Sequence, residues 1–181
     1  MRRGFTLIEL IIVVAILGIA GAMVIPSMTQ IHVLRVQAAV RTLVSDITFA
    51  QADAIAFQER RAIVFDVTGN SYRIVAVPGA TVDPDNNTLF LGGGPSGRYV
   101  VNFDRPDYAG AKITEADFAG LTTLIFDDLG SPAAFTTGDQ PGLGGAVTIF
   151  GSDQTFKVVV EPYTGRVTVR KLDVVVIHPI E

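Results

Sequence analysis

The stretch RRGFTLIELIIVVAILGIAGAMVIP, residues 2–26, determines how this chain is organised. From Phe5 to Ile25 its only polar side chains are those of Thr6 and Glu9. As a helix this run would be about 32 Å long, close to the ~30 Å hydrocarbon core of a bilayer. Two arginines precede it, and positive charges mark the cytoplasmic end of a membrane segment. The sequence therefore predicts a transmembrane helix over residues 5–25, with the rest of the chain on the far side.

Glu9 is the feature that a plain membrane anchor does not explain. A charged side chain at this depth costs about 3 kcal/mol or more, so it indicates a function. Nothing else in the apolar run can pair with it. Its partner must come from another chain, or from a new charge that processing creates.

Three other interpretations of this stretch are open. A buried core helix would be unusually long, and a plain anchor leaves Glu9 unexplained. A cleaved secretory signal peptide would use Arg2 and Arg3 as its basic region and Ala20-Gly21-Ala22 as its cleavage site. Glu9 would then interrupt the apolar part of that signal.

The segment from Arg3 to Leu10, followed by an apolar helix, resembles the leader region of type IV prepilins and type II secretion pseudopilins. The resemblance implies that a prepilin peptidase cuts between Gly4 and Phe5 on the cytoplasmic side and that Phe5 is then N-methylated. Residues 1–4 would be the leader peptide. Glu9 matches the acidic residue of this family.

Cleavage at this bond would supply the charge that Glu9 lacks. The new ammonium group of Phe5 lies four residues before Glu9, close enough for a pair within one helix. The resemblance implies a second use, in which Glu9 of one subunit pairs with the Phe5 ammonium of a neighbour in a filament. Because misaligned desolvated charges are costly, this pair would set the register of assembly.

Composition limits what the rest of the chain can be. The protein has 181 residues, enough for one sizeable domain after the membrane segment, and a net charge of −4. An acidic domain is a poor general binder of nucleic acid. The chain has no cysteine, so it has neither disulfides nor thiol chemistry. Many major type IV pilins close a loop with a disulfide, so the resemblance is closer to pseudopilins and minor pilins.

Residues 26–60 have a helical period, and they predict an amphipathic continuation of the membrane helix with a bend near Pro26. The apolar positions recur at spacings of three and four residues, whereas Asp46, Gln51, Asp53 and Gln58 lie mostly off this stripe. The stripe comprises Val36, Val40, Leu43, Ile47, Ala50, Ala54 and Phe57.

From residue 61 onwards the period is that of strands, so residues 61–181 predict a β-rich globular domain on the periplasmic or extracellular side. The fold class is α+β, a long N-terminal helix packed on a C-terminal antiparallel β-sheet domain. Residues 78–120 are rich in turn-forming residues and are expected to be largely loop. The expected strands are 62–67, 72–77, 89–91, 99–103, 123–126, 146–150, 155–160, 166–170 and 174–177.

A weaker resemblance lies in the C-terminal part. Phe126 and Gly130 form a Phe-x-x-x-Gly element, which two strands and a Gly-Arg-Val turn at residues 165–167 follow. This pattern is similar to the C-terminal domain of GspH-type pseudopilins and FimT-type minor pilins.

The sequence does not favour an enzyme, a cofactor or a metal site. His32 and His178 have no motif around them, and Asp127-Asp128 is interpreted as the start of a turn. The acidic loop that begins at Asp83 lacks the glycine and glutamate that an EF-hand requires.

Nucleic acid is the alternative partner, although we do not expect it. Some FimT-type minor pilins take part in DNA uptake through basic C-terminal residues. Here the candidates are Arg166, Arg170 and Lys171, of which the first two are expected on one strand face.

The sequence thus predicts a structural subunit, a minor pseudopilin of a type II secretion system, anchored in the bacterial inner membrane and assembling through its N-terminal helix. Its expected partners are other pilin or pseudopilin subunits and the prepilin peptidase/N-methyltransferase. A minor type IV pilin and a periplasmic domain on a plain anchor are the alternatives.

Overall fold

A computed structural model describes residues 6–92, 95–134 and 142–172 of the chain, without the side chains of residues 22–31 and 95. One long helix, α1 (Leu7–Phe57), is followed by two four-stranded sheets and two short 3-10 helices, η1 (Pro95–Gly97) and η2 (Pro106–Tyr108). The predicted α+β class is confirmed.

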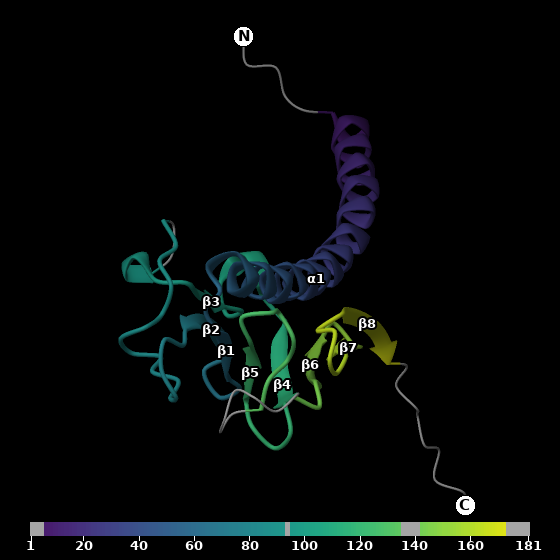
Figure 1. The fold of residues 1–181 in the computed structure, drawn as a ribbon. Helices are drawn as coiled ribbons and strands as arrows, with labels where there is room; N and C mark the ends of the chain where they lie inside the picture. The colour runs from purple at the N-terminus through teal and green to yellow at the C-terminus, as the bar shows by residue number, and fades with distance from the viewer. Residues whose placement is uncertain (1–5, 93–94, 135–141, 173–181) are drawn as a thin grey trace, which may run out of the picture.

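Helix α1 has two parts with different surroundings. Its C-terminal part lies across both sheets, whereas its N-terminal part projects away from them, and the helix bends between the two (Figure 1). Pro26 lies within the continuous helix. Because proline removes one backbone hydrogen bond and its ring clashes with the preceding turn, it accounts for a bend in this stretch.

Both sheets are antiparallel. The first has the order β3-β2-β1-β5 and the second the order β4-β6-β7-β8. The first sheet comprises β1 (Arg61–Asp66), β2 (Ser71–Ala76), β3 (Val100–Asn102) and β5 (Thr123–Phe126), and the second comprises β4 (Lys112–Asp117), β6 (Gly145–Gly151), β7 (Gln154–Val160) and β8 (Val167–Leu172). The chain builds β1, β2 and β3 in the first sheet, adds β4 in the second, and returns to the first for β5. It then completes the second sheet with β6, β7 and β8.

A single main core joins the helix to both sheets. Leu43 and Ile47 of α1 are fully buried, together with Ile63 and Ile74 of the first sheet and Ile149 of the second. The alternation of apolar and polar residues in the strands turns one face of each sheet toward α1. The expected apolar stripe is buried except at Phe57, which is 68% exposed at the last residue of the helix.

Asn70 connects the two sheets. It occupies a left-handed backbone conformation (φ 48°) in the turn between β1 and β2. Its side-chain NH₂ donates to the carbonyl of Ala111 (3.0 Å), and its side-chain oxygen accepts from the N–H of Ile113 in β4 (2.9 Å). Asn70 is only 7% exposed, so these bonds satisfy a buried amide and fix the turn of one sheet on an edge strand of the other.

Three expectations from the sequence were wrong or incomplete. Strand β4 lies in the region expected to be mostly loop. Residues 89–91 form no strand and one isolated bridge, between Phe90 and Arg98. Asp46, expected off the apolar stripe, is buried at 6% exposure. The strand expected at 174–177 lies outside the described residues.

Gln51 ties α1 to two loops that the sequence analysis had singled out separately. Its side-chain NH₂ donates to the carbonyls of Gly130 (2.7 Å) and Thr164 (2.9 Å). Gly130 ends the Phe-x-x-x-Gly element and Gly165 begins the Gly-Arg-Val turn, and both have positive φ. The two motifs therefore meet at one point of the helix.

We expect Gly165→Ala to destabilise the protein more than Gly120→Ala. Both glycines have positive φ, +65° and +85°, so both variants carry backbone strain. A Cβ at Gly165 would lie 2.6 Å from the Gln51 amide nitrogen, whereas a Cβ at Gly120 would meet nothing within 4 Å. The extra cost at Gly165 should be about 1–3 kcal/mol in the free energy of unfolding, measured by urea titration of the full chain in detergent. Equal costs would contradict the proposed role of Gln51.

Candidate functional site

The N-terminal end of α1 contains the predicted processing and assembly residues. Gly4 and Phe5 lie outside the described residues, so the structure gives no geometry for the bond between them. Thr6 is the N-cap, and its hydroxyl accepts a hydrogen bond from the backbone N–H of Glu9 at 3.3 Å. Glu9 is exposed in the first turn, near the positive end of the helix dipole.

Thr6 and Glu9 also have a local structural role that the sequence analysis missed. The spacing Thr-x-x-Glu at the start of a helix is that of a capping box, and half of that box is present here. A carboxylate in the first turn stabilises a helix by about 0.3–1 kcal/mol at an exposed position. This contribution is smaller than the cost of placing the same charge in a membrane, so capping alone does not explain Glu9.

The N-terminal part of α1 exposes apolar side chains on every side. Between Leu7 and Ile19, ten large aliphatic side chains are 48% to 78% exposed. Among the residues described, no helix meets the length and hydropathy expected of a membrane span. Figure 1 shows that neither sheet reaches this part of the helix. A helix that is apolar all round requires an apolar environment, which the protein's own β domain does not provide here.

Asp46 is the buried polar group through which α1 contacts the first sheet. Tyr72 of β2 donates its hydroxyl hydrogen to one carboxylate oxygen at 2.6 Å, and Tyr99 donates to the other at 2.9 Å. The Tyr99 ring also stacks on Phe49 of the helix, with the ring centroids 5.5 Å apart. These contacts fix the rotation of α1 over the sheet, because each one requires a particular helix face.

The environment of Asp46 shifts its protonation equilibrium. Burial raises the pKa of the Asp46 carboxyl above its ordinary value, and the two tyrosine hydrogen bonds partly oppose this rise. The buried position and the nearby carboxylate also raise the pKa of Tyr72. Burial and the same carboxylate raise the pKa of Tyr99 as well, so both tyrosines stay protonated and serve as hydrogen-bond donors.

Arg61 closes the other end of the helix against the sheet. It is 4% exposed at the start of β1, and its guanidinium pairs with Asp53 (2.5 Å) and Glu59 (2.6 Å). The same group lies 5.6 Å from the centre of the Phe57 ring. Two carboxylates and an aromatic face compensate for the burial of this cation.

The basic residues considered for nucleic-acid contact do not all lie on one face of the sheet. Arg170 and Lys171 are consecutive in β8, so their side chains point to opposite faces of the sheet. Arg170 is paired in register with Lys157 of β7, and the same outer face also carries Glu115 and Asp117 of β4. Arg166 is exposed just before β8. This mixture of charges makes the face poorly suited to a polyanion.

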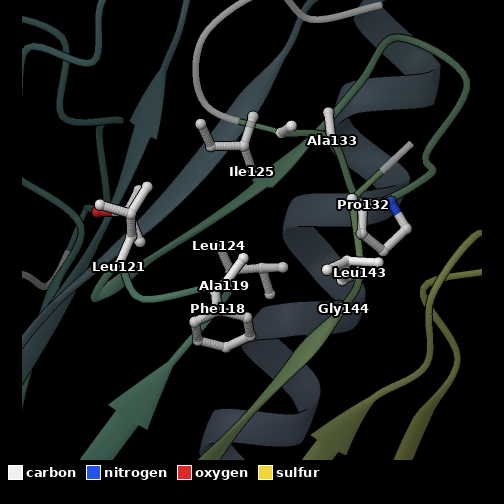
Figure 2. Close-up of a pocket in the computed structure, with 12 residues that line it drawn as sticks. Phe118, Ala119, Leu121, Leu124, Ile125, Pro132, Ala133, Leu143 and Gly144 are labelled. Carbon is white, nitrogen blue, oxygen red and sulfur yellow. The ribbon is translucent and has the colours of Figure 1, made fainter. Parts of the chain in front are cut away.

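A cavity of about 290 Å³ lies between the β4–β5 turn and the segments at 132–134 and 142–144. Its walls include Phe118, Leu124, Ile125 and Leu143 (Figure 2). None of the described lining residues is titratable. The Thr123 hydroxyl also lines the cavity, but none of the described lining residues is a general base that could activate it.

The remaining candidates from the sequence have local structural contacts. The Asp127 carboxylate accepts hydrogen bonds from the backbone N–H groups of Leu129 (3.0 Å) and Ser131 (2.7 Å), as expected at the start of a turn. Asp83 similarly accepts from the N–H of Asn86 at 3.1 Å. His32 is exposed on α1, and His178 lies outside the described residues. Within the part of the chain that is described, no cluster of three or more metal-ligating side chains occurs.

Comparison with known proteins identifies the N-terminal segment. The model of the prokaryotic N-terminal methylation motif matches residues 1–25. This match confirms the resemblance of the N-terminus to prepilins, whereas cleavage after Gly4 and methylation of Phe5 stay predictions. Among solved structures, the chain is similar to the minor pseudopilin EpsH of the type 2 secretion system of Vibrio cholerae, at 12% identity and a TM-score of 0.48 over 77% of this chain and 97% of that chain. The comparison with curated proteins finds no match.

We expect Asp46→Asn to remove one pH-dependent part of the protein's stability. Because the folded carboxyl has a raised pKa, it binds its proton more tightly than the unfolded one, whose ordinary value is 3.8. Its contribution is therefore fully present below that value and is lost as the pH rises through the folded pKa. The free energy of unfolding of the variant, measured by urea titration from about pH 3.5 upward, should lack this decline.

Asp85→Asn is the matched control, because the Asp85 side chain is 90% exposed. This control should keep the pH dependence of the unchanged chain. The same decline in Asp46→Asn as in the control would contradict the assignment to Asp46.

Proposed function

We propose that this protein is a non-enzymatic structural subunit of a pilus-like filament, a minor pseudopilin of a type II secretion system. The N-terminal methylation motif over residues 1–25 is the observation that carries the proposal. A leader with this motif directs a chain to a machinery that cleaves and methylates it. A modified N-terminus on a long apolar helix is useful to a protein that assembles into a filament as a subunit.

The division of α1 supports the same function. Its C-terminal part packs on both sheets through the main core. Its N-terminal part has an apolar surface on every side. In our proposal residues 5–25 cross the inner membrane once before assembly, with residues 1–4 in the cytoplasm and residues 61–181 in the periplasm. The same surface then packs against neighbouring subunits in the filament.

The proposed partners follow from this arrangement. They are other pilin or pseudopilin subunits, the inner membrane, and a prepilin peptidase that is also an N-methyltransferase. Glu9 would pair with the Phe5 ammonium, within the chain or in a neighbour, because its exposed carboxylate needs a positive partner in an apolar environment. A minor type IV pilin would need the same N-terminal features, so the choice of secretion over pilus system is part of the proposal.

Mass spectrometry of the N-terminus tests the proposal. The full chain, purified from a membrane that contains the prepilin peptidase, should begin with N-methylated Phe5. A chain that begins with Met23 would indicate signal peptidase, and one that begins with Met1 would indicate a plain anchor. Either result would contradict the proposal.

Glu9→Leu, made in the same background, separates processing from assembly. We expect cleavage and folding to be unchanged and incorporation into filaments to fall at least about tenfold, since the loss of a desolvated charge pair is worth more than 1.4 kcal/mol. Glu115→Leu is the control, since Glu115 is exposed on β4 and far from the helix start in sequence. Normal incorporation of Glu9→Leu would remove the assembly role of Glu9.

A further inference from the structure

A groove of about 440 Å³ runs along α1 beside the edge of the second sheet. Gln37, Arg41 and Val44 line it from the helix, and Phe156 and Val169 line it from β7 and β8. Val169 is 45% exposed, although its neighbours on the same face of the sheet pack into the core. The groove is therefore an apolar surface that is open on the side of β8.

Strand β8 is at the edge of its sheet. Its one neighbour among the described strands is β7, with which it pairs in register from Val160↔Val167 to Thr155↔Leu172. The strand contains no proline and no glycine. Because no described strand pairs with its outer side, the alternate backbone N–H and C=O groups there can accept another strand, which is the property that makes edge strands templates for pairing.

The sequence that follows β8 has the composition of such a strand. Residues 173–181 read DVVVIHPIE and lie outside the described part of the chain. Four consecutive β-branched residues, 174–177, follow Asp173, and Pro179 limits the run. A strand of this kind could present apolar side chains to the groove while its backbone pairs with the edge of β8.

The position of this run favours a different copy of the chain as the acceptor. To fold back on its own β8, the chain would need a turn of at least two residues immediately after Leu172. That turn would take up Asp173 and Val174, so it would shorten the apolar run. Neither residue is a glycine or an asparagine, which such a turn favours. Without such a turn, the whole apolar run would stay available for pairing with another copy.

Charge is also complementary between the two parts. Arg41 lines the groove, and Arg170 and Lys171 lie on the exposed end of β8. The segment 173–181 carries Asp173 and Glu181 and no lysine or arginine. Opposite charges on the two partners would favour this pairing.

We propose that residues 174–177 of one copy add as a strand to the edge of β8 in a second copy and fill the groove beside its helix. Each copy offers both the edge strand and the added segment, so the contact can be repeated from copy to copy. The contact is separate from that of the N-terminal helix. It does not depend on cleavage after Gly4, because every residue involved lies beyond the apolar run.

Disulfide trapping between two differently tagged copies tests this contact, because the chain has no cysteine of its own. One full-length copy carries Ser45→Cys, at an exposed position that lines the groove. The other carries Val175→Cys or Val176→Cys. The copies are mixed in detergent and oxidised, and the linked heterodimer is quantified on a non-reducing gel. An unchanged melting temperature checks the fold of each variant.

We expect the linked heterodimer to exceed the control by at least about tenfold, because pairing raises the local concentration of the two thiols. The control pairs the same tail variants with Asp85→Cys, whose side chain is exposed and far from the groove in sequence. One of the two tail positions should link better than the other, since successive side chains of a strand point to opposite faces.

Linkage no better than the control would overturn the proposal. A chain that carries both cysteines and closes on itself without forming dimers would also overturn it, because the tail would then occupy its own groove. Uncleaved and cleaved chains should link equally well. Failure of this contact is therefore distinguishable from failure of leader processing.

Discussion

The packing of one helix face against two sheets is the constraint on which the rest of the structure depends. Leu43 and Ile47 of α1 contribute to a core that includes residues of both sheets. Because the same helix face packs against both sheets, the C-terminal part of α1 cannot separate from either sheet without opening the core. The N-terminal part of α1 contacts neither sheet, so it projects from the domain with its aliphatic side chains exposed (Figure 1).

Buried polar groups give this packing its specificity. Asp46 accepts two tyrosine hydroxyls, Gln51 donates to two loop carbonyls, and Asn70 joins the turn of one sheet to a strand of the other. Hydrogen bonds of this kind add little net stability, but leaving any of these groups unpaired would be costly. They therefore favour one rotation of the helix and one placement of the sheets over other apolar packings. In the filament that we propose, such specificity would keep the surface that the helix presents to its neighbours fixed.

The sequence was most informative where the pattern was long or unusual. The apolar run, Glu9 and the helical period of residues 26–60 predicted the long helix, and strong alternation predicted β1, β2, β6 and β7. Strand β4 was missed because its residues KITEAD are mostly polar, as suits an edge strand with one exposed face. The division into two sheets could not be predicted, because it depends on Asn70 and on contacts between residues far apart in the chain.

The position of Asp46 in the sequence indicated that it is buried, but its polarity led to the opposite prediction. Asp46 lies three residues after Leu43 and four before Ala50, so its spacing placed it on the buried face of α1. Its polarity suggested exposure, and the two tyrosines that satisfy it come from sequence positions 72 and 99. The capping-box spacing of Thr6 and Glu9 was likewise readable in the sequence. In both cases the residue type was informative only together with its position on the helix.

The central claim is that the N-terminal part of α1 is covered by an apolar environment that the protein's own β domain does not supply. Labelling of intact membranes with a membrane-impermeant maleimide tests it most directly. A single cysteine at Ile12 or Ile16 should stay unlabelled until detergent is added, whereas a cysteine at Asp85 should react without detergent. Equal labelling of the helix and loop positions in intact membranes would contradict the account.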